Sequence, residues 1–190
     1  MSPFAMSATD WQLVPLDRVP PMPWRNGGGV TRELLAWPRA DDWQVRLSVA
    51  EVAADGPFSA FAGIERWFAV LQGAGVALTI DGTAHPLDAT SAPLRFDGGA
   101  VATCRLLDGP TLDFNLMAPP GRARMQRIRE GLHVAVGAGT LVAAYAHADP
   151  VTLPGLSGDL PARTLAWRVT QGPWSGQVQA REMLWMEVVA

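Results

Sequence analysis

The chain has 190 residues, of which 48% are hydrophobic and 17% are charged, and its formal net charge at pH 7 is −3. This composition excludes a disordered chain, which needs low hydrophobicity and high charge, and the acidic balance argues against nucleic acid as the main partner. No apolar run reaches the roughly 18 residues of a membrane span, so we expect no membrane association.

Two residue counts narrow the chemistry further. The 15 basic side chains are all arginine, and without lysine the chain cannot form a Schiff base with pyridoxal phosphate or with a carbonyl substrate. The single cysteine, Cys104, excludes an intramolecular disulfide. Residues 1–17 show neither the basic nor the apolar region of a signal peptide, and we therefore expect a cytoplasmic protein.

Short apolar segments bounded by glycine, proline and aspartate predict strands along most of the chain. In residues 43–49 apolar and polar side chains alternate, which places Arg46 and Ser48 on one face of a strand. Further strands are predicted at residues 67–71, 76–80, 84–87, 101–107 and 111–117. The glycine-containing turns at residues 72–75 and 81–82 predict β-hairpins.

The pattern changes at residues 118–131, which carry four arginines and no aromatic side chain that could stack on a nucleic-acid base. We interpret this segment as a solvated strand or a connector. Strands resume at residues 132–136, 141–146, 164–169 and 177–189. The regular spacing of short strands predicts an all-β sandwich or barrel in two halves, residues 1–121 and 122–190, packed on each other.

The sequence offers no standard metal or nucleophile motif. His85, His133 and His147 are scattered, and none forms an H-x-H or H-E-x-x-H pair, so we expect no metal cofactor. The chain also lacks the G-x-S-x-G elbow of serine hydrolases and the lysine of a P-loop.

Two segments are candidates for a binding site. Residues 23–34 contain three consecutive glycines between Arg25 and Arg32. The backbone N–H groups of these glycines could together bind an anion, an arrangement called a nest. The alternative is a flexible turn with the two arginines on the surface. Residues 55–67 place polar groups just before a very apolar strand, where they could face the mouth of a barrel. In the second segment, the favoured interpretation of Phe58 and Phe61 is that they are core residues.

The run Trp24–Glu33 resembles the W-[KR]-N-G-G-G-x-T-R-E signature of the HutD/Ves family. Later blocks similar to this family follow in the same order, at residues 43–52, 55–59, 63–66, 106–110 and 113–117. The blocks cover roughly residues 11–121, and residues 122–190 match more loosely. The resemblance implies a cupin fold with two β-barrel or jelly-roll halves in one chain, a bicupin. It also implies a link to bacterial histidine utilisation for HutD, or to stress for Ves.

Comparison with metal-binding cupins sharpens the metal argument. If Gly73 is the last glycine of the first cupin motif, the position of its glutamate ligand corresponds to Arg66. The positions of its two histidine ligands then correspond to Ser59 and Phe61. The histidine of the second cupin motif corresponds to Val101. A metal cation beside Arg66 would meet like charge at low dielectric. The resemblance therefore implies a metal site converted into an anion site.

The predicted ligand-binding residues comprise arginine guanidinium groups, neutral hydrogen-bonding side chains and apolar side chains that would line the site. They are Arg25, Asn26, Arg32, Arg46, Ser48, Phe58, Ser59, Phe61, Arg66 and Asn115, with Trp67 as a further wall. Arginine forks suit carboxylates. The family association suggests a small carboxylate such as urocanate, formiminoglutamate or formylglutamate as the partner. The competing interpretation is a structural network of arginines and glutamates.

Several functions stay open on the sequence alone. The first is a regulatory or accessory binding protein of histidine utilisation, with a homodimer as one option for its assembly. The second is a metal-independent isomerase, epimerase or hydrolase with Glu51 or Glu33 as the general base. A metal-dependent dioxygenase would need the three histidines to converge. A protein-binding module would need a surface built on Trp167, Trp174 and Trp185.

Overall fold

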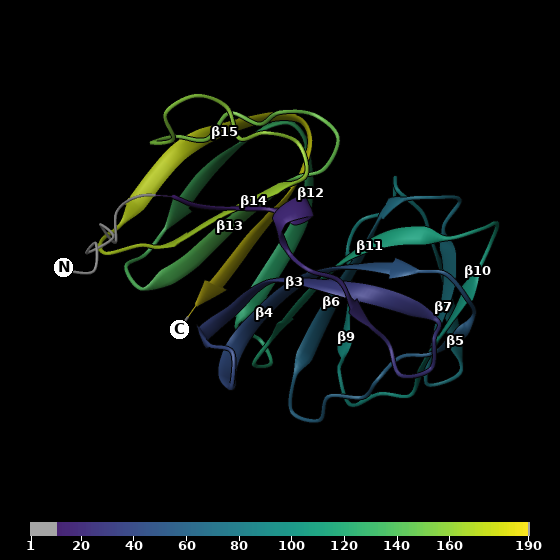
Figure 1. The fold of residues 1–190 in the computed structure, drawn as a ribbon. Helices are drawn as coiled ribbons and strands as arrows, with labels where there is room; N and C mark the ends of the chain where they lie inside the picture. Colours follow the sequence, from purple (N-terminus) through teal and green to yellow (C-terminus); the bar gives the residue numbers. More distant parts are fainter. Residues whose placement is uncertain (1–10, 190) are drawn as a thin grey trace. The chain divides into compact units, whose positions relative to one another are not determined.

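The computed structural model describes residues 11–189, which are all-β apart from one short 3₁₀ turn, η1 (Leu16–Arg18) (Figure 1). What we expected of residues 1–10 as part of a non-secretory N-terminus lies outside the described residues. None of the helical structure in the described chain is long and apolar enough to cross a membrane. The chain divides into a first compact unit, Leu16–Ala123, and a second unit formed by the described residues before and after it.

The first unit contains two antiparallel sheets. One has six strands in the order β2-β3-β4-β11-β6-β9, and the other has four strands in the order β5-β10-β7-β8. The six-stranded sheet consists of β2 (Met22–Pro23), β3 (Gly29–Arg39), β4 (Asp42–Val52), β11 (Thr111–Ala118), β6 (Glu65–Gln72) and β9 (Leu94–Asp97). The four-stranded sheet consists of β5 (Gly56–Pro57), β10 (Ala102–Leu106), β7 (Val76–Ile80) and β8 (Thr83–Leu87).

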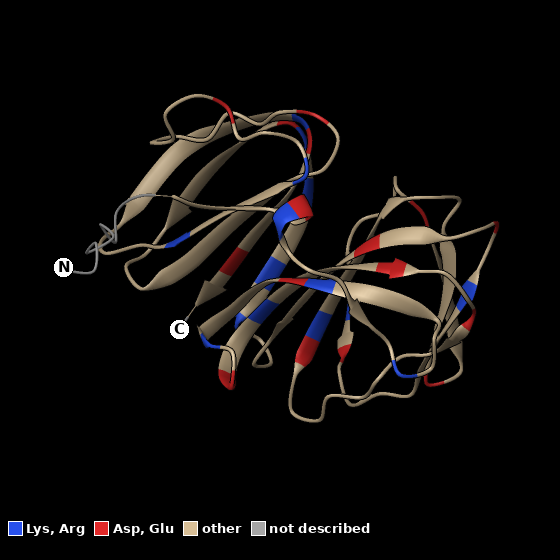
Figure 2. Ribbon diagram, in the orientation of Figure 1, with Lys and Arg blue, Asp and Glu red and all other residues tan. Residues whose placement is uncertain are grey.

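The core of the first unit lies between these two sheets. Every second residue of a strand points to the same side, so β4 and β6 each send one row of side chains inward. Val52 and Phe68 from the six-stranded sheet pack in one cluster with Val76, Leu78 and Ala102 from the four-stranded sheet. Charged residues occupy few positions along the strands, and most of the ribbon carries none (Figure 2). An arginine on an inward row is therefore an exception that needs an explanation.

One of the two predicted hairpins is confirmed and the other is wrong. The turn at Asp81 and Gly82 joins β7 to β8, which pair as antiparallel neighbours. The turn at residues 72–75 instead carries the chain from β6 in one sheet to β7 in the other. Gly73 has a φ of 103°, and a side chain there would come within 2.6 Å of the Pro110 carbonyl oxygen. The glycine therefore serves a crossing between sheets, which the local sequence does not distinguish from a hairpin turn.

The second unit contains a five-stranded antiparallel sheet in the order β1-β14-β13-β15-β12. Its strands are β1 (Gln12–Pro15), β14 (Thr164–Val169), β13 (Thr140–Ala146), β15 (Trp174–Val189) and β12 (Ala123–Val136). Its core includes Trp11, Trp185, Leu153 and Leu160. The arginine-rich segment after residue 118 thus enters a strand at Ala123.

The predicted division at residues 1–121 and 122–190 needs one correction. β1 pairs with β14 along Gln12–Pro15, so this N-terminal strand belongs with the later residues and not with the unit that follows it in sequence. A strand of four residues carries too short a pattern to show its partner, because pairing depends on the hydrogen bonds offered by a sheet edge.

The sequence also missed β3. The strand carries two register shifts against β4, between Glu33 and Leu35 and between Trp37 and Pro38. Each shift changes which residues face inward, so the period-two pattern on which strand prediction depends is interrupted.

Candidate functional site

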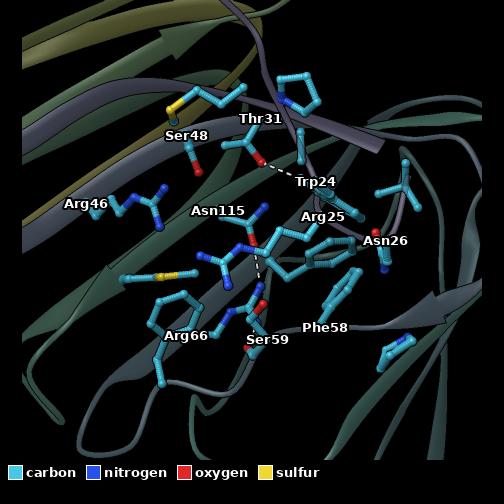
Figure 3. Close-up of a pocket in the computed structure, with 18 residues that line it drawn as sticks. Trp24, Arg25, Asn26, Thr31, Arg46, Ser48, Phe58, Ser59, Arg66 and Asn115 are labelled. Carbon is cyan, nitrogen blue, oxygen red and sulfur yellow. Dashed lines mark hydrogen bonds between the residues drawn. The ribbon is translucent and has the colours of Figure 1, made fainter. Parts of the chain in front are cut away.

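The first unit contains a cavity of about 560 Å³ between its strands (Figure 3). Its lining residues are Met22, Pro23, Trp24, Arg25, Asn26, Thr31, Arg46, Ser48, Ala50, Val52, Pro57, Phe58, Ser59, Phe61, Arg66, Phe68, Asn115 and Met117. This size falls in the range of about 300–1,000 Å³ that is usual for small-molecule sites.

Strand register places the polar lining residues in two rows across the six-stranded sheet. In the first row Met117 of β11 lies between Arg46 of β4 and Arg66 of β6. In the second row Asn115 lies between Ser48 and Phe68. The alternation of side chains along each strand brings these positions to the same face.

Arg66 is the buried cation of the cavity, with 5% of its surface exposed. Its Nη2 donates a hydrogen bond to Oδ1 of Asn115 at 2.9 Å, and its Nη1 donates to the Ser59 carbonyl oxygen at 3.3 Å. Its Cζ lies 5.2 Å from the ring centroids of both Phe58 and Phe96. The aromatic rings therefore cover the guanidinium group, and Asn115 and the Ser59 carbonyl accept hydrogen bonds from its N–H groups.

The charge of Arg66 has no counterion within residues 11–189. Among the described residues no carboxylate oxygen forms an ion pair with it, and its Nε has no hydrogen-bond partner. Burial, followed by the nearby positive charge of Arg46, lowers the pKa of Arg66 to about 10. A buried cation without a charged partner is costly, and an anion entering the cavity would relieve that cost.

Arg46, unlike Arg66, is paired with a carboxylate. Its Nε donates to Oε2 of Glu33 at 2.6 Å, and both side chains are partly exposed. Its guanidinium also lies 6.0 Å from the Trp43 ring. Glu33 therefore neutralises the second arginine of the row, which leaves Arg66 as the unmatched charge.

The glycine segment does not form an anion-binding nest. The N–H of Gly27 donates to the Trp24 carbonyl oxygen, and the N–H of Gly28 donates to Oδ1 of Asn26. Gly29 packs against the Glu51 carbonyl oxygen, where a side chain would collide. Because these groups are occupied, the glycines shape a tight turn that places Trp24 and Arg25 against the cavity.

Nine of the ten predicted ligand-binding residues line this cavity: Arg25, Asn26, Arg46, Ser48, Phe58, Ser59, Phe61, Arg66 and Asn115. Arg32 does not, because it lies opposite Val49, on the face of β3 and β4 that points away from the cavity. The same alternation turns Glu51 away, and Trp67 donates its Nε1–H to Glu65 instead of forming a wall. These three expectations are corrected by strand periodicity.

Sequence reasoning missed much of the apolar lining. The missed residues are Met22, Pro23, Trp24, Thr31, Ala50, Val52, Pro57, Phe68 and Met117. A signal was available for four of them, because Ala50 and Val52 follow Ser48 at steps of two residues, Phe68 follows Arg66, and Met117 follows Asn115. Met22, Pro23, Trp24 and Pro57 come from loops and two-residue strands with no usable period, and Thr31 lies on β3, whose pattern is interrupted by register shifts.

The positions that the comparison with metal-binding cupins assigned to metal ligands do not fit a metal here. Ser59, Phe61 and Arg66 line the cavity, and none of them offers a strong metal ligand. Val101 is 73% exposed and does not line the cavity. Within residues 11–189, no three His, Cys, Asp or Glu side chains are grouped so that they could hold a metal ion.

Comparisons with known proteins add three relatives. A protein encoded in the hutC 3′ region of Pseudomonas putida is 40% identical over 119 residues, and protein Ves of Cronobacter sakazakii is 36% identical over 104 residues. The aligned parts span 60% and 58% of these two relatives. The solved structure of HutD from Pseudomonas fluorescens SBW25 matches 94% of this chain and 98% of that one, with 31% identity and a TM-score of 0.85.

The family comparison covers the described chain more fully. The model of the HutD family matches residues 17–186, which include every residue that lines the cavity. The signature that the sequence showed at Trp24–Glu33 lies in this match and builds one wall of the cavity. The chain therefore belongs to the HutD family.

Proposed function

We propose that the first unit binds a small carboxylate in the cavity, with its negative charge on Arg66. The carrying observation is that Arg66 is buried without a carboxylate partner while its side chain borders an open cavity (Figure 3). An arginine guanidinium binds a carboxylate through two parallel N–H···O bonds, which are stronger than neutral hydrogen bonds.

The neighbours of Arg66 suit such a ligand. Because Oδ1 of Asn115 already accepts from Arg66, the amide nitrogen of Asn115 is the group left to donate. The hydroxyl of Ser48 lies beside Asn115 in the same row and is a second neutral donor. Together they would bind the carboxylate oxygens that do not face the guanidinium.

The family membership and the relatives support a proposal for the biological role. We propose that the protein is a cytoplasmic regulatory or accessory component of histidine utilisation, and that urocanate, formiminoglutamate and formylglutamate are its candidate ligands. The support is the relative encoded in a hutC 3′ region and the similarity to HutD. We further propose that the two units are the halves of a bicupin, on the basis of the family resemblance and of their antiparallel sheets.

A thermal-shift titration tests the binding proposal. Metal-stripped protein is titrated with the three candidates and with histidine and glutamate. A ligand at 100 times its Kd should add about 2.7 kcal/mol to the free energy of unfolding. The shift should vanish in Arg66→Met and persist in Arg39→Met, which changes an exposed arginine paired with Asp42. Absence of any shift, or a shift that survives in Arg66→Met, would reject the proposal.

The enzyme alternative rests on Glu33. Of the two bases that the sequence suggested, Glu51 faces away, whereas Glu33 binds Arg46 at the cavity wall. A metal-independent isomerase, epimerase or hydrolase would use Glu33 as its base. Incubation with each carboxylate, followed by NMR, would reveal new products, and these should disappear in Glu33→Gln.

A further inference from the structure

The cavity extends well beyond the two arginines. On β4 its lining includes Arg46, Ser48, Ala50 and Val52, which are every second residue of the strand. At about 3.4 Å per residue, the first and last of these lie about 20 Å apart along the strand. A carboxylate group bound at Arg66 would fill only one end of this length.

The chemistry of the lining changes along that length. The row of Arg46 and Arg66 is cationic, and the row of Ser48 and Asn115 offers neutral polar groups. Beyond them β4 presents Ala50 and Val52, which are 4% and 1% exposed and carry no polar side-chain atom. Their register partners on β11, Asp113 and Thr111, are buried, do not line the cavity and are hydrogen-bonded to each other.

The apolar end is also lined by flat rings. The centroids of Trp24 and Phe58 are 6.2 Å apart in an edge-to-face arrangement, and those of Phe58 and Phe68 are 5.8 Å apart. The indole N–H of Trp24 donates to Oγ1 of Thr31 at 2.7 Å, so this donor is already taken (Figure 3). These walls suit a planar apolar group, because aromatic rings prefer offset or edge-to-face contacts with one another.

The charges of the lining favour one carboxylate over two. Arg66 is buried and without a counterion, Arg46 is neutralised by Glu33, and Arg25 is exposed, where water screens its charge. The buried part of the site therefore has one unmatched positive charge, at one end.

We propose that the cavity binds an elongated monocarboxylate whose other end is a planar apolar ring, an aryl or heteroaryl group. This inference rests on the proposed carboxylate site at Arg66. The acid end binds at Arg66 and Asn115, which are hydrogen-bonded to each other across adjacent rows, and the ring lies against Ala50, Val52 and Trp24.

Three probes separate this proposal from its alternatives in two-dimensional ¹⁵N NMR titrations of the full chain. Acetate supplies the acid end alone, trans-cinnamate adds the planar ring, and glutarate replaces the ring with a second carboxylate. We expect cinnamate to bind about 10- to 100-fold more tightly than acetate, the gain typical of burying one phenyl ring, and more tightly than glutarate. Cinnamate should shift the indole N–H signal of Trp24, whereas acetate should leave it in place.

Two variants test where the ring lies. Ala50→Leu fills the apolar end and should weaken cinnamate at least tenfold while changing acetate less than threefold. The matched control is Ala84→Leu, the same change at an exposed position on β8. Trp24→Leu removes a flat wall, should weaken cinnamate about fivefold, and identifies the Trp24 signal by its loss. Acetate binding in each variant shows that the arginine end is intact.

The outcomes distinguish this inference from the function on which it rests. If no probe binds, or if binding survives in Arg66→Met, the carboxylate site itself is wrong and the inference falls with it. If all probes depend on Arg66 but glutarate binds most tightly, or cinnamate gains nothing over acetate, the carboxylate site stands and the aryl end is overturned.

Discussion

Both units place an arginine among aromatic rings, but the two arginines have different surroundings. In the first unit Arg66 has phenylalanine rings over its faces and a cavity at its edge, with no carboxylate partner among the described residues. In the second unit the Cζ of Arg168 lies 4.9 Å and 4.5 Å from the ring centroids of Trp11 and Trp174. Tryptophan is the strongest cation–π partner, so Arg168 is held by the core of its own unit.

The difference shows that an arginine with aromatic neighbours is not by itself a binding site. Trp11, Trp174 and Trp185 pack on one another with centroid distances between 6.0 and 6.4 Å, and Arg168 completes that cluster. The first unit holds Arg66 at the edge of its cavity and a buried carboxyl group, Asp113, on the adjacent strand β11. Four measurements test whether Arg66 serves binding and Arg168 serves stability.

The largest effect should come from Asp113. Asp113 is fully buried, its Oδ2 accepts a hydrogen bond from Thr111, and its Oδ1 has no hydrogen-bond partner among the described residues. Burial raises the pKa of Asp113 from 3.8 to about 7. The folded state then binds a proton that the unfolded state releases, so stability is highest at low pH and is lost as the pH rises toward 7. Between pH 5 and 8 the free energy of unfolding should fall by about 3 kcal/mol through this group.

Urea unfolding at several pH values measures this dependence. Asp113→Asn should flatten the curve over that range, because the amide stays neutral and can still accept from Thr111. Asp41→Asn, at an exposed position, should leave the wild-type slope in place. An unchanged slope in Asp113→Asn would show that Asp113 is ionised in the folded protein.

The second effect is the loss of binding in Arg66→Met. The affinity for a carboxylate should fall at least about 100-fold, because hydrogen bonds to a charged group are among the strongest that a site offers. The free energy of unfolding of the ligand-free protein should change by less than about 1 kcal/mol, since an unmatched buried cation contributes little to stability. Calorimetric titration and urea unfolding measure the two quantities, and a large loss of stability would instead favour a structural role.

The third effect concerns Arg168, where we expect a loss of stability without a loss of binding. Arg168→Met should lower the free energy of unfolding by about 2 kcal/mol, through the loss of two desolvated cation–π contacts. Carboxylate affinity should remain within about threefold of wild type, because Arg168 does not line the cavity. Loss of binding in a folded Arg168→Met variant would contradict the contrast between the two units.

The smallest effect concerns Glu33. Glu33→Gln removes the counterion of Arg46 and should tighten carboxylate binding about three- to tenfold, with a steeper dependence on salt. Glu51→Gln is the matched control, since Glu51 lies on the face of β4 that points away from the cavity. Weaker binding in Glu33→Gln would show that Glu33 orients Arg46 for the ligand instead of competing with it.

The strands that the sequence predicted well are those with an unbroken period of two. The segment from Trp43 to Val49 lies within β4, and its alternation correctly placed Arg46 and Ser48 on one face. The same periodicity, carried on to the end of β4, would have found Ala50 and Val52. Local composition and period therefore determined the all-β class and the family resemblance, because both depend on neighbouring residues.

Pairing between strands was decided by the tertiary structure. β1 joins the second unit, and the turn at residues 72–75 crosses between sheets. The sequence predicted neither, because hydrogen bonds between strands that are distant in sequence do not show in the local pattern. The same holds for the site. The sequence supplied Arg66, Asn115 and Glu33, but register alone set Arg66 beside Asn115 and let Glu33 neutralise Arg46. Which arginine stays unmatched depends on these long-range contacts, and the proposed anion site depends on that arginine.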